Sequence, residues 1–393
     1  MLRDVVVVGG GIIGMTIGLR LARAGLRVAV LDQNRLGSEA STAAAGLLAA
    51  QCLTDPPAAG GIEEAFFQAS LQARSLYPGF LESLAEGRPV SSNMRGNLCV
   101  ATTPEQATLL ETRVRGHRAR GLSARLLSAG EASALVPGLE ARCGALFPED
   151  GVVDNQELMP ALRDALLAAG VALHEDDPVV AVLTEAGRAV GVRTTRGTHP
   201  SGAVVLAAGA WLDGLLPPGE PRTAMHPARG QIVVLEAGAT GPDLPVIGEH
   251  MYVVPRAGGR MLLGSTVENA GFDRGTTAGG VAGILSGVAA FYPGVAAWGW
   301  VTAWAGLRPR ASDDWPVVGP ARETGGLYIA GGHYRNGILW APLTAEWILR
   351  GLQGESLPEE AGWFDPGRFG QPGGGKSPPQ PGYFRSTTDE ATV

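Results

Sequence analysis

The stretch that decides the fold runs from Val5 to Asp32 and reads Val5-Val-Val-Val-Gly9-Gly-Gly11-Ile-Ile-Gly14-Met-Thr-Ile-Gly-Leu-Arg-Leu-Ala-Arg-Ala-Gly25-Leu-Arg-Val28-Ala-Val-Leu-Asp32. Two β-branched runs flank a segment with helical periodicity, and such runs are typical of buried parallel strands. Three glycines in the pattern G-x-G-x-x-G join the first strand to the helix. This order predicts a Rossmann-like α/β unit that binds a dinucleotide.

The chemistry of a dinucleotide explains this spacing. The first glycine permits a tight turn, the second lets the backbone approach a pyrophosphate, and the third allows the helix to pack closely on the strand. The N-terminus of the helix stabilises the phosphate charge. Asp32 ends the second strand, where a carboxylate accepts hydrogen bonds from ribose hydroxyls and disfavours a 2′-phosphate. NAD and FAD both remain open at this point, as does a glycine-rich turn without a ligand.

A run of small residues follows between Ser38 and Leu48: Ser-Glu-Ala-Ser-Thr-Ala-Ala-Ala-Gly-Leu-Leu. Small side chains permit a flat, bulky ring to approach the backbone. Ser41 is a candidate N-cap for a helix directed at a phosphate. By composition alone, an ordinary alanine-rich helix start explains the run equally well.

Two arginines near the C-terminal end occupy unusual surroundings. Arg308 lies in Trp-Ala-Gly-Leu-Arg-Pro at the end of a predicted strand, and Arg335 lies in Gly-Gly-His-Tyr-Arg-Asn-Gly-Ile-Leu between a predicted strand and helix. A guanidinium held rigidly among Gly, Pro and aromatic residues suits bidentate capture of a carboxylate. The alternative is that both arginines pair with buried acids.

Composition bounds the remaining possibilities. The chain has 393 residues, enough for two domains, and its net charge of −7 disfavours nucleic acid or an anionic membrane as partner. Lys376 is the only lysine, which excludes a buried Schiff-base lysine or a Walker loop. The three cysteines are isolated and the six histidines show no metal-ligand spacing, so no metal is expected. We expect a cytoplasmic enzyme with no membrane contact that acts on a small molecule and is a candidate homo-oligomer.

Periodicity and capping signals predict the elements along the chain. Helices are expected over 62–86 and 281–291, and after the capping residues Thr103 and Asp154, with Gln106 and Glu157 closing the boxes. Strands are expected over 97–101, near 178–183, 189–194 and 203–206, within 231–265, and around 298–304. The cofactor domain would be discontinuous, comprising 1–86, 149–217 and 300–365. Segments 87–148 and 218–299 would form a substrate domain, and 366–393 a disordered tail.

Together, these motifs resemble the glycine oxidases, flavoenzymes of the D-amino-acid oxidase superfamily that serve thiamine biosynthesis. The resemblance spans roughly residues 1–365 and includes His250-Met-Tyr-Val-Val-Pro-Arg256 and Gly264-Ser-Thr-Val-Glu268 as well as the two arginine motifs. It implies an α/β fold in which a Rossmann-like FAD-binding domain carries an inserted substrate domain built on an antiparallel sheet. FAD would bind without a covalent bond.

The resemblance also assigns residues. Arg308 would bind the substrate carboxylate, with Tyr252 in the same pocket, Arg335 beside substrate and flavin, and His250 near. Val267 stands where some relatives carry a methionine, a difference that bears on substrate size. The residues expected to bind FAD are Gly9, Gly11, Ile12, Ile13, Gly14, Asp32, Gln33, Ala40, Ser41, Ala45, Gly46, Leu47, Val179, His333, Tyr334, Arg335, Asn336, Gly337, Ile338 and Leu339.

The implied reaction is oxidative deamination of glycine or a small amino acid. Hydride would pass from Cα to flavin N5, O2 would be reduced to H2O2, and water would hydrolyse the imine to an oxo acid and ammonia. The alternatives are a D-amino-acid dehydrogenase that reduces a quinone, a sarcosine-type oxidase, and a non-catalytic FAD-binding protein.

Overall fold

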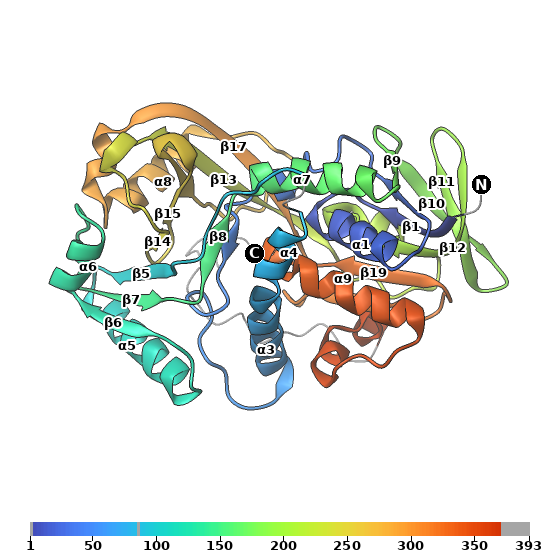
Figure 1. Ribbon diagram of the computed structural model, residues 1–393, viewed down its shortest axis with the longest axis horizontal. Coiled ribbons are helices and arrows are strands. Elements are labelled where there is room, and N and C mark those ends of the chain that lie inside the picture. The colour runs from blue at the N-terminus through green and yellow to red at the C-terminus, as the bar shows by residue number, and fades with distance from the viewer. Residues whose placement is uncertain (1–2, 85–86, 371–393) are drawn as a thin grey trace.

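The strand before the glycine motif, β1 (Arg3–Val8), lies at the centre of a large sheet in the computed structural model, which describes residues 3–84 and 87–370 (Figure 1). The strand order is β10-β11-β12-β1-β2-β9, with β19 on β12 and β18 on β19. Parallel pairing joins β1 to β2 and β12, β2 to β9, and β12 to β19. The apolar segment that starts at Val204 therefore returns to the cofactor sheet, as predicted. The strand bounds are β2 (Val28–Leu31), β9 (Ala172–His174), β10 (Val179–Glu185), β11 (Arg188–Thr194), β12 (Thr198–Leu206), β18 (Val317–Pro320) and β19 (Leu327–Gly331).

Successive residues of β1 pack into two hydrophobic cores, one on each face of the sheet. Val5 and Val7 pack with the helices α1 (Ile12–Arg23), α3 (Gly61–Ser75), α7 (Asn155–Ala168) and α9 (Gly337–Gln353) on one face of the sheet. Val6 and Val8 pack with β10, β11 and β12 and with the 3-10 helix η1 (Gly209–Leu215) on the other face. Burial on both faces explains why Val5 to Val8 of β1 are all apolar.

A second large sheet lies at the other end of the molecule (Figure 1). Its order is β17-β13-β16-β15-β14-β5-β7-β6, and all its pairs are antiparallel except β14 with β5. α8 (Ala278–Ala289) covers one face, and α5 (Pro104–Ala119) packs on part of the other. The bounds are β5 (Asn97–Ala101), β6 (Arg125–Ser128), β7 (Cys143–Phe147), β13 (His226–Glu236), β14 (Val246–Ile247), β15 (Tyr252–Pro255), β16 (Arg260–Gly264) and β17 (Gly299–Arg310).

Short elements connect the two sheets. β3 (Leu47–Leu48), β8 (Gly151–Val153) and β4 (Ser92–Asn93) form a three-stranded sheet, and α2 (Ala40–Ala43) precedes β3. α4 (Tyr77–Glu82) follows α3, and α6 (Ala129–Leu135) follows β6. Among the helices in the described ranges, none combines the length and apolarity needed to cross a membrane.

Two predicted boundaries change in the structure. The single helix predicted over 62–86 is divided into α3 and α4, because Pro78 has no N–H with which to continue the hydrogen-bond ladder; residues 85–86 lie outside the described ranges. β17 pairs along its length with β13, so this strand belongs to the second sheet, although most of it fell in the predicted cofactor segment 300–365. The pairing of distant strands decides this membership, and the local sequence does not.

Capping and tail predictions are only partly confirmed. Thr103 and Gln106 form the expected capping box. Asp154 accepts hydrogen bonds from the N–H groups of Gln156 and Glu157, but the Glu157 carboxylate accepts from Ser91 instead of closing a box. Residues 366–370, assigned to the disordered tail, form a 3-10 turn whose Arg368 donates hydrogen bonds to Asp313. The remainder of that prediction, 371–393, lies outside the described residues.

Candidate active site

A cavity of about 550 Å³ lies between the two sheets. One end is formed by the glycine turn, the end of β2 and the small-residue run, and the other by β13, β15 and β17. Predicted site residues that line it are Gly9, Gly11, Ile12, Ile13, Asp32, Gln33, Ala40, Ser41, Ala45, Gly46, Leu47, Val179, Tyr252, Arg308, His333, Tyr334, Arg335, Asn336, Gly337 and Ile338. Its size and apolar lining are typical of a small-molecule or cofactor site.

The glycine turn has the geometry that a bound phosphate needs. Gly9 has φ of +107°, and a Cβ there would lie 2.3 Å from the carbonyl oxygen of Ala207. A Cβ at Gly14 would lie 1.9 Å from the carbonyl oxygen of Gly9, so this glycine provides packing space. α1 begins directly after Gly11, and its N-terminal residues line the cavity. The positive end of the α1 dipole is therefore available to an anion.

Asp32 lies at the end of β2, where it lines the cavity and accepts a hydrogen bond from the glycine turn. Its Oδ2 accepts from the Gly10 N–H at 2.6 Å, and its Oδ1 accepts from the Asn34 N–H at 2.8 Å. Burial raises the pKa of Asp32 above its ordinary value, although both N–H groups oppose this effect. A carboxylate oxygen has more than one acceptor site, so both oxygens can still accept from ribose hydroxyls.

The small-residue run is held from behind through its carbonyl groups. The Asn155 amide donates to the carbonyls of Ser41 and Thr42 at 2.7 and 3.0 Å. The Trp304 indole donates to Ala43 at 3.2 Å, and Arg256 donates to Ala45 at 2.8 Å. These donors fix the run as one wall of the cavity.

Ser41 has a different role from the one predicted. It lies inside the four-residue helix α2, and its Oγ accepts from the Ile12 N–H at 2.8 Å. Ser41 therefore satisfies a free N–H in the first turn of α1 and does not cap a helix of its own.

Arg308 enters the cavity from β17 and is fixed by two neighbours. Its guanidinium donates to the Ser265 hydroxyl at 2.7 Å and to the Thr266 carbonyl at 3.1 Å. It lies directly over Gly230 of β13, where a Cβ would be 2.1 Å from one guanidinium nitrogen. The guanidinium lines the cavity, and Tyr252 from β15 lines it as well.

Tyr252 and Arg335 add polar groups to the same cavity. Burial raises the pKa of the Tyr252 phenol, so the hydroxyl keeps its proton near neutral pH. Arg335 lies over the Tyr334 ring at 4.9 Å, and Arg310 lies over that ring at 5.2 Å while pairing with Asp314. Burial, with Arg308 and Arg310 nearby, lowers the pKa of Arg335. Such a concentration of positive charge favours an anionic ligand.

Comparison with known proteins gives this arrangement a context. Residues 4–350 match the model of a family described as FAD dependent oxidoreductase. The chain belongs to the FAD-dependent oxidoreductases. It is 37% identical to glycine oxidase of Geobacillus kaustophilus over 87% of this chain and 90% of that protein. The crystal structure of glycine oxidase from that organism matches with a TM-score of 0.84 and 34% identity, covering 90% of this chain and 95% of that one. The bifunctional protein ThiO/ThiG of Trichormus variabilis is 32% identical over 88% of this chain, which spans about half of that protein.

FAD is the cofactor of this family, and the cavity fits it. The glycine turn and the N-terminus of α1 would receive the pyrophosphate, while Asp32 would receive the ribose. The small side chains of the run leave room for a flat ring. A Cβ on Gly306 would lie 2.6 Å from the Cβ of Ala43, so this glycine lets the run pack closely against β17. α9 begins at Gly337, and its positive end also lies at the cavity.

Three predicted residues do not line the cavity. Gly14 and Leu339 are buried in helix packing next to residues that do. The side chain of His250 is 48% exposed and lies 3.7 Å from Glu249. Side chains alternate within a strand, but β15 begins only at Tyr252, so His250 does not share the direction of Tyr252.

Other residues line the cavity without having been predicted from the sequence. They include Ala43, Ala44, Trp211, Gly230, Ile232 and Ser265. Ala43 and Ala44 belong to the small-residue run, and Ser265 lies in the quoted motif Gly264 to Glu268, so the sequence held signals for these three. Gly230 and Ile232 carry no local signal, because they reach the site only through the pairing of β13 with β17.

Proposed function

We propose that this protein is an FAD-dependent amino-acid oxidase that acts on glycine or another small amino acid. The observation that carries the proposal is the position of Arg308, fixed beside Tyr252 in the cavity that also holds the dinucleotide-binding turn. A planar guanidinium binds a carboxylate through two hydrogen bonds and thereby orients the rest of the ligand. The relatives named glycine oxidase support glycine as the substrate.

The side chains of the cavity would position the substrate. Arg308 binds the carboxylate, and the protonated Tyr252 hydroxyl can donate a further hydrogen bond to it. Holding the carboxylate at a fixed point restricts Cα to one side of the cavity, and such positioning lowers the entropy cost of reaction. FAD, when bound, would supply the acceptor for the hydride of Cα and the two electrons that reduce O2 to H2O2. Water then hydrolyses the imine product to an oxo acid and ammonia.

The histidine and carboxylates near the cavity are poorly placed to act as a base. His333 is buried and shares a hydrogen bond of 2.9 Å with Thr344, and burial lowers its pKa to about 3. Within the described ranges, the carboxylates that line the cavity are Asp32 and Glu39, which lie at the glycine turn and the start of the small-residue run. The substrate would therefore react as the neutral amine, whose lone pair forms the imine.

The place of the reaction in metabolism is part of the same proposal. The relatives named ThiO/ThiG support a role in thiamine biosynthesis. A reducing compartment such as the cytoplasm agrees with the three free cysteines, Cys52, Cys99 and Cys143.

Anaerobic mixing of the yellow holoenzyme with glycine, sarcosine and D-amino acids tests the proposal. We expect glycine or a small amino acid to bleach the flavin absorbance, and air to restore it with one H2O2 per turnover. Bleaching without peroxide formation would favour a dehydrogenase. If no amino acid bleaches the flavin, the proposal is wrong.

A further inference from the structure

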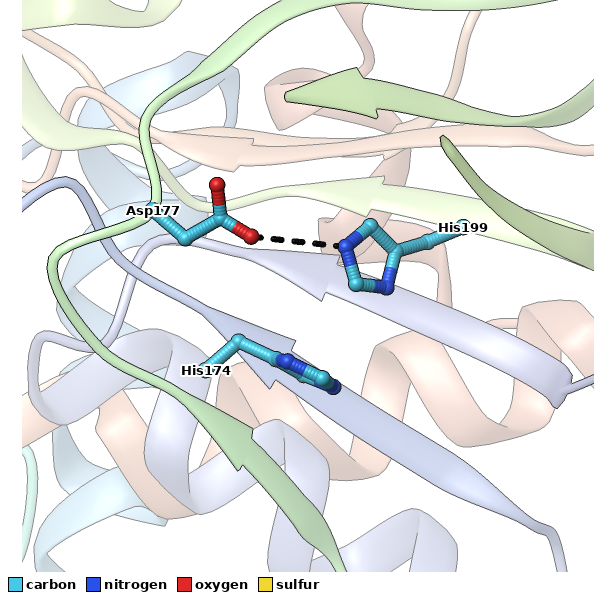
Figure 2. Close-up of side chains that lie close together, drawn as sticks. All are labelled: His174, Asp177 and His199. Carbon is cyan, nitrogen blue, oxygen red and sulfur yellow. Dashed lines mark ion pairs between the residues drawn. The ribbon is translucent and has the colours of Figure 1, made fainter. Parts of the chain in front are cut away.

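A cluster of three side chains lies outside the cavity and joins the end of β9 to the start of β12. His174 ends β9, Asp177 follows in the loop, and His199 comes from the start of β12 (Figure 2). One donor atom from each residue lies within 4.8 Å of the other two. His199 Nε2 is 3.4 Å from Asp177 Oδ2, and the two imidazole ring centroids are 4.6 Å apart.

The Asp177 carboxylate is unusual in this setting. Its exposed fraction is only 4%, and its Oδ1 has no hydrogen-bond partner within the described part of the chain. A buried carboxylate oxygen without a partner carries a free-energy cost, and such oxygens are usually paired or bound to a metal ion. Oδ2 faces His199 while Oδ1 has no partner among the described residues, so the carboxylate is incompletely satisfied and can bind a cation.

We propose that His174, Asp177 and His199 form a binding site for a divalent transition-metal ion, with Zn²⁺ as the best match. Imidazole nitrogen and carboxylate oxygen are both zinc ligands, and donor atoms around a tetrahedral zinc ion lie about 3.4 Å apart. The His199–Asp177 pair already has that separation, and the donor atom of His174 lies within 4.8 Å of both. A water molecule would occupy the fourth position.

The charges around the cluster agree with this assignment. A metal ion binds neutral imidazole, and the ring nitrogens of His174 and His199 both lie close to the Asp177 carboxylate. Arg3 of β1 is a positive charge near His174. The Asp177 carboxylate offsets part of the charge of the metal ion, while Arg3 weakens binding without removing a ligand.

The site would act on the cofactor through the backbone of Asp32. The Asp32 N–H donates to the His174 carbonyl at 2.9 Å, and the Asp177 N–H donates to the Asp32 carbonyl at 3.0 Å. Val179, two residues beyond Asp177, lines the cavity. A metal ion bound to both ends of this loop would restrict the segment that positions the ribose-binding carboxylate. Zinc is therefore expected to tighten FAD binding.

The test uses the full chain as holoenzyme, without a polyhistidine tag and after treatment with a chelator. Calorimetric titration with Zn²⁺ should show one equivalent per chain, and His174→Gln, Asp177→Asn and His199→Ala should each weaken its affinity by at least about tenfold. The matched control is His226→Ala, at a histidine outside the cluster, which should leave zinc binding unchanged. Saturable binding that survives all three substitutions would overturn the proposal.

Two further measurements keep the proposal falsifiable if a variant does not fold. The unsubstituted holoenzyme should bind one equivalent of Co²⁺ with visible d–d absorption beyond the flavin bands, and Zn²⁺ should abolish this absorption. Apoprotein prepared by removal of FAD should then bind FAD more tightly with zinc than without it. Absence of a saturable Co²⁺ band would mean that Asp177 and His199 form only an ion pair. None of these readouts depends on amino-acid turnover.

Discussion

At the residue scale, the position of Arg308 depends on a neighbour that has no side chain. Gly230 leaves the space in which the guanidinium lies, while Ser265 and Thr266 determine its direction. The sequence identified Arg308 from its Gly and Pro surroundings, which are local. It gave no indication of Gly230, because β13 and β17 are far apart along the chain and meet only in the folded sheet.

Arg308→Lys tests the carboxylate site directly. Lysine keeps the charge but loses the planar pair of donors, so Cα would no longer be held in one position. We expect the rate of flavin reduction by glycine to fall by about 10²-fold, while the flavin spectrum without substrate stays unchanged. Anaerobic stopped-flow spectroscopy measures both. A variant that is reduced as fast as the parent would show that another group binds the carboxylate.

Gly230→Ala tests the space beneath the guanidinium. The new Cβ would lie 2.1–2.3 Å from three guanidinium atoms, so Arg308 must move. We expect the KM for glycine to rise by about tenfold or more, since displacements of this kind cost roughly 1–3 kcal/mol. Gly283→Ala in α8 is the matched control, because a Cβ there would contact nothing within 4 Å. Equal KM values for the two variants would contradict the role of Gly230.

At the element scale, the glycine turn and the small-residue run differ in how they are stabilised. The turn, α1 and Asp32 are adjacent along the chain, so their geometry was predictable from spacing alone. The run is fixed by Asn155, Trp304 and Arg256, which come from α7, β17 and the residue after β15. The residues near the run in the sequence do not predict these hydrogen-bond donors, because the donors lie far away along the chain. The same reason explains why the sequence did not predict the cluster of His174, Asp177 and His199.

Asn155→Ala tests the support behind this run. Asn155 is buried and donates to two carbonyl groups, which would be left without these donors. We expect about 2–4 kcal/mol less stability, and weaker retention of FAD during gel filtration. Gln156→Ala is the control at the adjacent exposed residue. If both variants melt at the same temperature and retain FAD equally, the run is held by other contacts.

At the scale of the whole molecule, two buried histidines should set the acid limit of stability. His117 Nε2 lies 3.1 Å from the carbonyls of Gln51 and Thr54, and its buried Nδ1 has no hydrogen-bond partner among the residues that the structure describes. Burial lowers the pKa of His117 to about 4 and that of His333 to about 3. Both rings are therefore neutral in the folded protein under conditions where an exposed histidine takes up a proton.

The sign of the pH effect follows from proton uptake. Below about pH 6.5 these two histidines bind protons in the unfolded chain but stay neutral in the folded chain. The free energy of unfolding therefore decreases as the pH is lowered. For His117 the loss reaches up to about 3 kcal/mol as pH falls to about 4. Urea unfolding above pH 6.5 and near pH 5 measures this change in the free energy of unfolding. His117→Gln should remove this part of the pH dependence, whereas His250→Gln at an exposed histidine should not; identical pH profiles would contradict the prediction.

The strands of the cofactor sheet come from distant parts of the chain, and this has a consequence for its synthesis on the ribosome. Gly9 leaves the ribosome first, but the cavity also requires β12, β19 and the start of α9 at Gly337. About 330 residues separate these ends, which at roughly 5–20 residues per second corresponds to roughly 20 s to one minute of translation. The nascent chain therefore exposes the apolar residues Val5 to Val8 of β1 long before FAD can bind. These residues stay open to aggregation during that interval, and a message truncated before β19 would yield a polypeptide that lacks part of the FAD cavity.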